Sequence, residues 1–250
     1  MEKNSTNAVV ITNLVKVYRG DKKKGNKEVL HGINLTIPRG QFFGLLGPNG
    51  AGKTTTINCT TGISSITSGS IVVSGHDVVK DYRLARAAIG LSPQEFNIDI
   101  FQTVDEILDY AAGFFGIVGK EMRGRREEML TRFGLAEHRA KKFQFLSGGL
   151  KRRVTLAKAM IHNPDVLILD EPTAGVDVET RRALWKFLRE LHAAGKTIIL
   201  TSHYLEEVEE LCGRVAIIKD GAIIMDETME NATKEKKLEH VYLEAVGHTD

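Results

Sequence analysis

The stretch "GPNGAGKTT", Gly47 to Thr55, decides the fold class of this chain. It matches the pattern G-x-x-x-x-G-K-[ST] and directly follows an apolar segment, Phe42 to Leu46, that has the length of a buried strand. In such a loop the backbone N–H groups and a helix N-terminus surround the β-phosphate of a nucleotide. The lysine reaches the β and γ oxygens, and the Thr54 hydroxyl ligates Mg²⁺. We therefore expect a nucleotide site built on Gly47, Pro48, Asn49, Gly50, Ala51, Gly52, Lys53, Thr54 and Thr55.

Short apolar segments separated by turns fill the first third of the chain. They are "AVVITNLVKVY" from Ala8, "GINLTIPRGQFFGLLG" from Gly32 and "GSIVVSGHDV" from Gly69. Their spacing predicts an antiparallel β layer that leads into the strand before the phosphate loop.

The middle of the chain, residues 96–163, has helical periodicity instead. "TVDEILDYAAGFF" begins with Thr103 three residues before Glu106, a capping box, and "GKEMRGRREEMLTRFGL" and "LKRRVTLAKAMIH" also predict helices. Strand patterns return in "DVLILDEP" and "KTIILTSH", and "RVAIIKDGAIIMDE" predicts a hairpin around Asp220-Gly221.

These patterns together indicate an α/β fold: a P-loop NTPase (RecA-like) core with an antiparallel β subdomain and an inserted α-helical subdomain. We expect a single domain, 1–250, with the core and β subdomain in 9–95 and 164–225. The helical subdomain would be 96–163, and 226–250 would form a short C-terminal extension.

Composition narrows the class of protein. Lys and Arg number 34 against 32 Asp and Glu, a net charge of +2 that is too balanced to argue for nucleic acid. Cys59 and Cys212 have neither metal-site spacing nor a disulfide pattern, which favours a reducing interior. The start lacks a signal-peptide core, and the longest nearly apolar run, Tyr110 to Gly119, is about half of a bilayer span. We expect a soluble, cytosolic chain that reaches a membrane only through a partner.

Polar residues that follow predicted strands are the candidates for catalysis. Asp170 and Glu171 end the apolar run "VLILDEP"; Asp170 would hold Mg²⁺, usually through water, and Glu171 would activate the attacking water. His203 ends "TIILTSH", and Gln94 follows "AIGL". His203 could contact the γ-phosphate, and Gln94 could sense both the γ-phosphate and the metal. In isolation each would be an ordinary turn or structural residue; the shared sheet edge next to the phosphate loop makes them site candidates.

A second glycine-rich turn, "LSGG", opens a basic helix and offers Ser147, Gly148 and Gly149 as another anion site. The predicted helical insert would hold it away from Lys53 of the same chain. We therefore expect two copies to meet head to tail, with Ser147 of each copy capping the phosphate held by Lys53 of the other. The alternative is a generic turn.

Taken together, "GPNGAGKTT", "SPQEF", "LSGGLKRR", "VLILDEPTAGVD" and "TSHYLEEVEELCGRVAIIKDG" resemble the ATP-binding cassette family, in family order and spacing, from about Val9 to Met225. The resemblance implies ATP, Mg²⁺ and the head-to-tail ATP sandwich. It also implies the residue roles: Walker A at Gly47–Thr55, Walker B at Val166–Asp170, catalytic Glu171, Q-loop Gln94, signature Ser147–Gly149, D-loop Asp177, switch His203 and adenine-stacking Tyr18. For Tyr18 the alternative is simple packing in a strand.

Finer features resemble the bacterial exporter branch, such as daunorubicin-resistance-type transporters, in which the ATPase is a separate subunit. The ending "LEHVYLEAVG" resembles that branch's C-terminal segment, so we expect a complete chain. Leu150 departs from the pattern because this position usually holds glutamine, and altered dimer affinity is the expected effect.

The resemblance implies two partners and no nucleic acid. One is a second copy or a paralogous ATPase subunit. The other is an integral permease, which would hold the chain at the cytoplasmic face of the inner or plasma membrane and contact it where Phe96 or Phe101 is exposed.

The main alternative is a non-transport cassette ATPase acting on ribosomes or nucleic acid. The region between Lys53 and Asp170 lacks the heptad run of repair proteins, and the chain has one cassette rather than two. A binding module that does not cleave ATP is disfavoured by Glu171 and His203, and a GTPase by the lack of an Asn-Lys-x-Asp motif.

Overall fold

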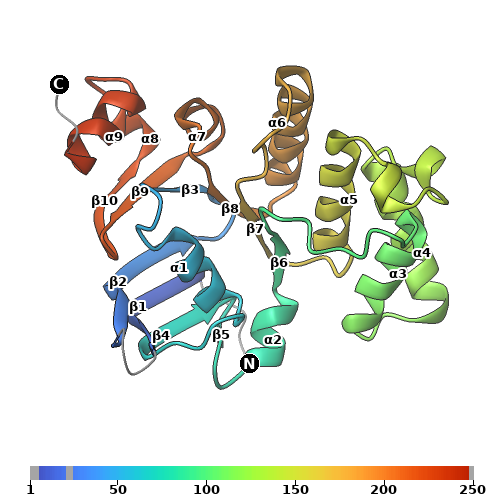
Figure 1. Ribbon diagram of the computed structural model, residues 1–250, viewed down its shortest axis with the longest axis horizontal. Coiled ribbons are helices and arrows are strands. Elements are labelled where there is room, and N and C mark those ends of the chain that lie inside the picture. The colour runs from blue at the N-terminus through green and yellow to red at the C-terminus, as the bar shows by residue number, and fades with distance from the viewer. Residues whose placement is uncertain (1–5, 21–24, 248–250) are drawn as a thin grey trace.

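The computed structural model describes residues 6–20 and 25–247 and contains two β-sheets (Figure 1). Strands β1 (Asn7–Tyr18), β2 (Lys27–Pro38), β4 (Ser68–Val73) and β5 (His76–Asp77) form an antiparallel sheet in the order β2-β1-β4-β5. This confirms the predicted antiparallel layer. Strand β2 begins earlier than the sequence pattern indicated, since Leu30 is fully buried in the core beneath the sheet.

The second sheet has six strands in the order β10-β9-β3-β8-β7-β6. Its members are β3 (Phe42–Leu46), β6 (Ile89–Ser92), β7 (Val166–Asp170), β8 (Thr197–Thr201), β9 (Arg214–Lys219) and β10 (Ala222–Thr228). Strands β6, β7, β8, β3 and β9 are parallel, and β10 pairs antiparallel with β9. The carboxyl ends of the parallel strands therefore share one edge, which is where an α/β sheet binds its ligands.

Alternate side chains of the six-stranded sheet enter two separate hydrophobic clusters. From β3, Phe43 packs in the cluster that holds the antiparallel sheet, helix α1 (Lys53–Thr60) and Ala85, whereas Phe42 packs on the opposite face in the cluster of the later helices. From β8, Ile199 and Ile198 divide in the same way. A strand that is buried on both faces is a continuous apolar run, which explains why "FFGLL" and "TIILT" lack polar alternation.

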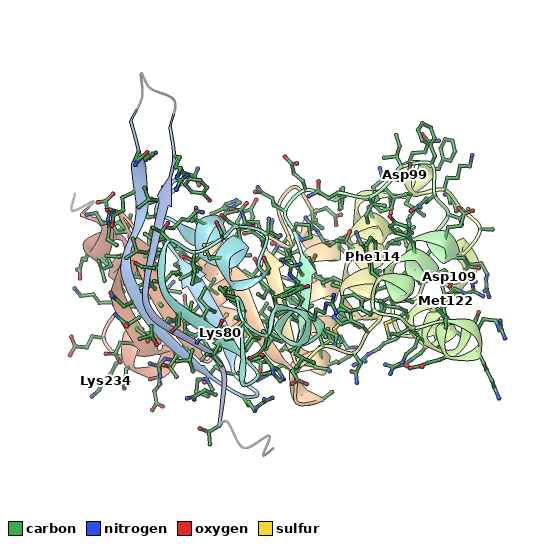
Figure 2. The ribbon with its side chains drawn as sticks, turned by 90° about the horizontal axis from the view of Figure 1, so that it is seen from below. Lys80, Asp99, Asp109, Phe114, Met122 and Lys234 are labelled. Carbon is green, nitrogen blue, oxygen red and sulfur yellow. The ribbon has the colours of Figure 1, made fainter. Side chains whose placement is uncertain are left out.

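Helices α3 (Val104–Phe114), α4 (Gly119–Arg132) and α5 (Gly148–Met160) occupy the predicted helical region, with short 3₁₀ turns at Ala136–His138 and Phe143–Phe145. The Thr103–Glu106 capping box is present: Thr103 N donates to Glu106 Oε2 at 2.8 Å, and Glu106 N donates to Thr103 Oγ1 at 3.3 Å. In Figure 2 the labelled Asp109 on α3 and Met122 on α4 lie at one end of an elongated molecule, and Lys234 lies at the other.

The remaining helices are α2 (Tyr82–Ala87), α6 (Val178–Ala193), α7 (Leu205–Leu211), α8 (Met229–Ala232) and α9 (Leu238–Val246). In α6 the buried residues are Leu184, Trp185, Leu188 and Leu191, which form one apolar face of the helix. Over the described part of the chain, no helix has both the length and the apolar character needed to traverse a bilayer.

Candidate nucleotide site

The loop after β3 carries the phosphate-binding pattern into helix α1, whose first residue is Lys53. Two of its glycines are sterically required. A Cβ at Gly47 would lie 2.2 Å from the carbonyl oxygen of Ile218, and Gly52 has φ +115° with Leu30 Cδ2 only 2.7 Å from an added Cβ. The backbone of the loop therefore turns tightly against β9 and β2, and its N–H groups precede a helix N-terminus.

Lys53 is buried, and its Nζ donates to the carbonyl oxygens of Gly47 at 2.6 Å and Pro48 at 3.1 Å. Burial lowers the pKa of the ammonium, and the negative charges of Glu171 and Asp170 oppose that effect. The ammonium thus lies between the loop and the two carboxylates, the place from which it would contact nucleotide phosphates.

Asp170 is the last residue of β7 and is 7% exposed. The Thr201 hydroxyl donates to its Oδ1 at 2.5 Å across the β7–β8 pair. Burial raises the pKa of this carboxyl and Glu171 adds to the rise, while the Thr201 hydrogen bond and Lys53 lower it. Asp170 is therefore fixed in one orientation at the end of the sheet.

Glu171 has φ +48°, which is unusual for a residue with a side chain. Its amide donates to the Thr201 carbonyl at 3.1 Å and to the Thr201 hydroxyl at 3.2 Å, and these contacts hold the turn. Two of the predicted residues contact the Glu171 carboxylate. Gln94 Nε2 donates to its Oε2 at 2.8 Å, and His203 Nδ1 lies 3.2 Å from the same oxygen. Three strand ends thus converge on one carboxylate.

A cleft of about 910 Å³ surrounds this group. It is lined by the predicted residues Tyr18, Asn49, Gly50, Gly52, Lys53, Thr54, Thr55, Gln94, Glu171 and His203, together with Lys27 and Val29 of β2. The Tyr18 ring is 40% exposed at the cleft, with Lys16 Nζ 4.6 Å from its centroid. The cleft thus brings together phosphate-loop, carboxylate, amide, imidazole and aromatic groups.

The glycine-rich turn of α5 is not part of this cleft. Ser147 caps α5 by accepting from the Leu150 amide at 3.4 Å, and neither it nor Gly148 nor Gly149 is among the described residues that line the cleft. Gly149 instead faces the first turn of α6, where an added Cβ would lie 2.7 Å from Thr180 Cγ2. Asp177 caps that helix, accepting from the amide of Thr180 at 2.9 Å.

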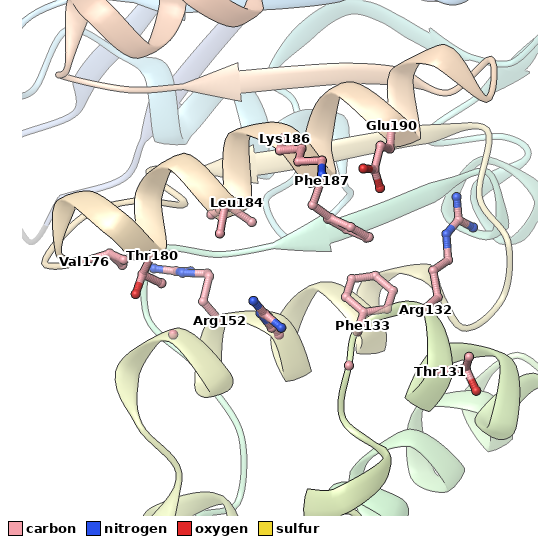
Figure 3. Close-up of a pocket in the computed structure, with 14 residues that line it drawn as sticks. Thr131, Arg132, Phe133, Arg152, Val176, Thr180, Leu184, Lys186, Phe187 and Glu190 are labelled. Carbon is pink, nitrogen blue, oxygen red and sulfur yellow. The ribbon is translucent and has the colours of Figure 1, made fainter.

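A smaller pocket of about 330 Å³ separates α6 from α4 and α5 (Figure 3). Phe133 and Phe187 face one another across it with ring centroids 4.6 Å apart, and Gly149 and Thr180 belong to its lining. The Leu150 side chain is half-buried and packs against the main hydrophobic cluster. The signature turn is therefore seated on α6, away from the phosphate loop of its own chain.

The sequence pattern of the ABC transporter family matches residues 30–174, more than half of the chain. The chain belongs to the ABC transporter family. The cassette is 44% identical to the Nod factor export ATP-binding protein I of Burkholderia thailandensis over 82% of its length and 68% of that protein. It is 40% identical to the linearmycin resistance ATP-binding protein LnrL of Bacillus subtilis, over 81% of the cassette and 65% of that relative. The cassette thus spans about two thirds of the length of these relatives.

Solved structures agree with this membership. A structure of the ATP-binding subunit of an ABC transporter has a TM-score of 0.82 at 26% identity, covering 95% of the cassette and 99% of that chain. A dimeric ATP-binding cassette in a post-hydrolysis state, bound to ADP and Pi, has a TM-score of 0.79 at 27% identity, covering 88% and 98%. The P-loop NTPase fold and the ATPase activity expected from the sequence are thereby confirmed. The relatives favour a transporter subunit over a protein that acts on ribosomes or nucleic acid.

Three residues that support the site are not predicted from the sequence. Thr201 holds both Asp170 and Glu171, and its position directly opposite Asp170 in the β7–β8 register could have suggested this role. Arg152 and Glu207 are buried, and no local pattern marks them, since Arg152 binds Pro93, 59 residues away, and Glu207 accepts from Thr173, 34 residues away. Phe96 is half-buried rather than exposed as expected, because it packs edge-to-face on Phe143 with ring centroids 5.5 Å apart.

Proposed function

We propose that the cassette works as a head-to-tail pair in which each ATP lies between the Lys53 cleft of one copy and the Ser147 turn of the other. The observation that supports this arrangement is the separation of the two anion sites within one chain: the cleft holds the phosphate loop and the catalytic candidates, whereas the signature turn packs on α6. A single bound nucleotide meets only one of them. The second protomer would be another copy or a paralogous ATPase subunit.

The residues of the cleft suit ATP and Mg²⁺. Lys53 and the loop residues Gly47–Thr55 would hold the phosphates, and Tyr18 offers its exposed ring to the adenine. Three groups nearby offer oxygen ligands for a hard cation: the exposed Thr54 hydroxyl, the buried Asp170 carboxylate and the Gln94 amide. The described residues contain no cluster of three acidic, histidine or cysteine ligands, which agrees with a Mg²⁺ that takes its remaining ligands from phosphate and water.

Hydrolysis follows from what the chain's own residues can do. Glu171 would accept the proton of the attacking water, with Gln94 and His203 fixing the orientation of its carboxylate. His203 also reaches the cleft and can donate to the γ-phosphate. Bound Mg²⁺ would neutralise charge that develops on the phosphoryl group. From the second copy, Ser147, Gly148 and Gly149 would add the amides of a helix N-terminus, and Asp177 would lie beside them.

ATP would close the pair because it contacts both halves, whereas ADP reaches only one. Differential affinity of this kind is what allows a ligand to shift a conformational equilibrium. Hydrolysis would then reopen the pair. The division into core (9–95, 164–225), helical subdomain (96–163) and C-terminal extension (226–250) belongs to this proposal, since closure brings the helical part of one copy over the cleft of the other.

A groove of about 650 Å³ between α2, α3 and α5 would receive the permease. Its lining is largely apolar and includes Tyr82, Phe114 and Phe115, which are exposed by 43%, 74% and 40%. The sequence predicts this contact at Phe96 or Phe101, and of these two only Phe101 is exposed, by 63%. Together with relatives whose names refer to export and resistance, the groove supports an exporter subunit held at the cytoplasmic face of a membrane by an integral partner.

The test is the oligomeric state of Glu171→Gln. The substitution keeps the shape of the side chain and removes the base, so hydrolysis should fall roughly 10²–10⁴-fold. With Mg-ATP the variant should elute as a dimer in size-exclusion chromatography with light scattering, and with Mg-ADP as a monomer. A variant that stays monomeric at saturating Mg-ATP would exclude the head-to-tail pair.

A further inference from the structure

Arg152 is a buried cation in the second turn of α5, the helix that the signature turn opens. Its side chain is 3% exposed. Figure 3 shows it extending from α5 towards the start of α6, where Thr180 is labelled. Its Nη1 donates to the carbonyl oxygen of Pro93 at 2.9 Å, and its Nη2 donates to the carbonyl oxygen of Gln94 at 3.3 Å. One guanidinium thus binds two consecutive carbonyls of the loop after β6.

Burying a guanidinium is unfavourable, and the surroundings offset this only in part. Desolvation lowers the pKa of Arg152, opposed by the negative charges of Glu207 and Asp170. The guanidinium carbon lies 5.1 Å from the Phe96 ring centroid, a cation–π contact. Its Nε has no hydrogen-bond partner among the described residues. An apolar residue of similar size would fill this place without such a cost. The reason for an arginine here therefore lies in the two carbonyls that it binds.

The contacts continue from those carbonyls into the cleft. Arg152 holds the backbone of Gln94, and the Gln94 side chain donates to Glu171. Ser147, five residues before Arg152 in the sequence, caps the N-terminus of the same helix. A helix is rigid over two turns, so a displacement of the signature turn is carried to the Gln94 backbone through Arg152.

We propose that Arg152 is a positioning residue that couples the signature turn to Gln94, and through Gln94 to the Glu171 carboxylate of the same chain. This inference rests on the proposed head-to-tail pair, in which the two ends of the relay serve different nucleotides. Ser147 contacts the ATP held by the second copy, whereas Gln94 and Glu171 act on the chain's own ATP. Closure around one nucleotide therefore sets the geometry at the other, which makes hydrolysis cooperative in ATP.

The experiment compares steady-state phosphate release against ATP concentration for the full chain, Arg152→Gln and Arg152→Lys, with Arg153→Gln as the matched control. Arg153 is the exposed neighbour on the same helix. The unsubstituted chain should have a Hill coefficient above 1, up to the two sites of the pair. In Arg152→Gln the Hill coefficient should fall to about 1 and the maximal rate about tenfold, because a slightly misplaced catalytic group loses much of its effect.

Two further measurements separate positioning from folding. Binding of a fluorescent ATP analogue to the Arg152→Gln protomer should stay within about twofold of the unsubstituted value, since Arg152 does not line the cleft. Arg152→Lys keeps the charge but cannot span two carbonyls as a planar fork does, so it should restore the fold and only part of the cooperativity. If Arg152→Gln does not fold, the Hill coefficient and maximal rate of Arg152→Lys alone test the proposal.

Unchanged cooperativity and rate in Arg152→Gln, or in Arg152→Lys where only that variant folds, would overturn the relay. A loss of thermal stability with an unchanged Hill coefficient would do the same, because it would reduce Arg152 to a structural contact. Non-cooperative hydrolysis by the unsubstituted chain also overturns it. Failure of the pair itself is distinguishable, since it appears as a monomeric Glu171→Gln protein in Mg-ATP.

Discussion

Gln94 Nε2 donates a hydrogen bond of 2.8 Å to Glu171 Oε2 across the carboxyl ends of β6 and β7. The same oxygen faces His203 Nδ1 at 3.2 Å. The carboxylate that we propose as the acceptor of the proton from water is thus held from two sides by residues that follow fixed strands of the sheet. Its orientation therefore depends on both neighbours.

Gln94→Ala removes one of the two groups that orient Glu171. We expect the maximal rate of ATP hydrolysis to fall about tenfold with a much smaller change in KM, because a positioned base loses alignment while the phosphate loop still binds nucleotide. The measurement is steady-state phosphate release, with Glu95→Ala, an exposed neighbour, as the control. A Gln94→Ala protein with the normal maximal rate would show that Glu171 needs no such support.

Glu207 on α7 is a fully buried carboxyl that receives three hydrogen bonds. Thr173 Oγ1, Ser202 Oγ and Trp185 Nε1 donate to it at 3.0, 2.7 and 3.0 Å. Glu207→Ala leaves all three donors buried without an acceptor, and each such loss costs on the order of 1–3 kcal/mol. Chemical denaturation should therefore show a loss of at least about 3 kcal/mol, against less than about 0.5 kcal/mol for the exposed Glu206→Ala.

Equal stability of the two glutamate variants would contradict this role for Glu207. Glu207→Gln should lose an amount of unfolding free energy between those of Glu207→Ala and Glu206→Ala. Its amide keeps one acceptor oxygen but adds N–H groups that have no acceptor there. Since Ser202 precedes His203 and Thr173 follows the Glu171 turn, the same variants should also reduce hydrolysis.

Titration of His162 should make the free energy of unfolding depend on pH. Burial lowers its pKa to about 4, against 6.5 for the free side chain. The ring stacks on Phe115 with centroids 3.6 Å apart, and its Nε2 lies 2.9 Å from the Ile89 carbonyl oxygen, which it must donate to. Between pH 6.5 and 4 the unfolded chain binds a proton that the folded chain does not, so stability is full above pH 6.5 and falls on acidification.

At pH 5 the lowered pKa of His162 reduces the free energy of unfolding by about 2 kcal/mol. His162→Gln retains a donor for Ile89 but does not titrate, so the decrease in unfolding free energy from pH 7 to pH 5 should be smaller by that amount. The exposed His240→Gln provides the control and should keep the full decrease. Identical pH profiles for the unsubstituted chain and His162→Gln would exclude His162 as the source.

The exposed ring of Phe114 gives a test of the permease groove. Phe114→Ser removes apolar surface that water already contacts, so ATPase activity and stability of the isolated cassette should not change. In the assembled transporter we expect at least a tenfold loss of transport and reduced co-purification of the membrane partner. Phe101→Ala tests the alternative position from the sequence, and a transport defect confined to that variant would move the contact away from the groove.

Much of the candidate site was predictable because its signals are local. The phosphate loop, the carboxylates after β7 and the histidine after β8 each follow an apolar run, and parallel strands place their ends at one edge. What the sequence could not provide is the strand order, in which β9 pairs with β3 across most of the chain length. Arg152 and Glu207 depend on that order, since their partners meet only after the sheet and helices have assembled.

The chain has a single tryptophan, Trp185, and its indole N–H is the donor to Glu207. Indole emission shifts with the polarity and hydrogen bonding around the ring. The Glu207 carboxylate that accepts from Trp185 through Oε1 also accepts, through Oε2, from Ser202, the residue before His203. The cassette therefore carries a built-in optical reporter. Stopped-flow fluorescence of the unlabelled protein can therefore monitor the surroundings of Ser202 and His203 during turnover.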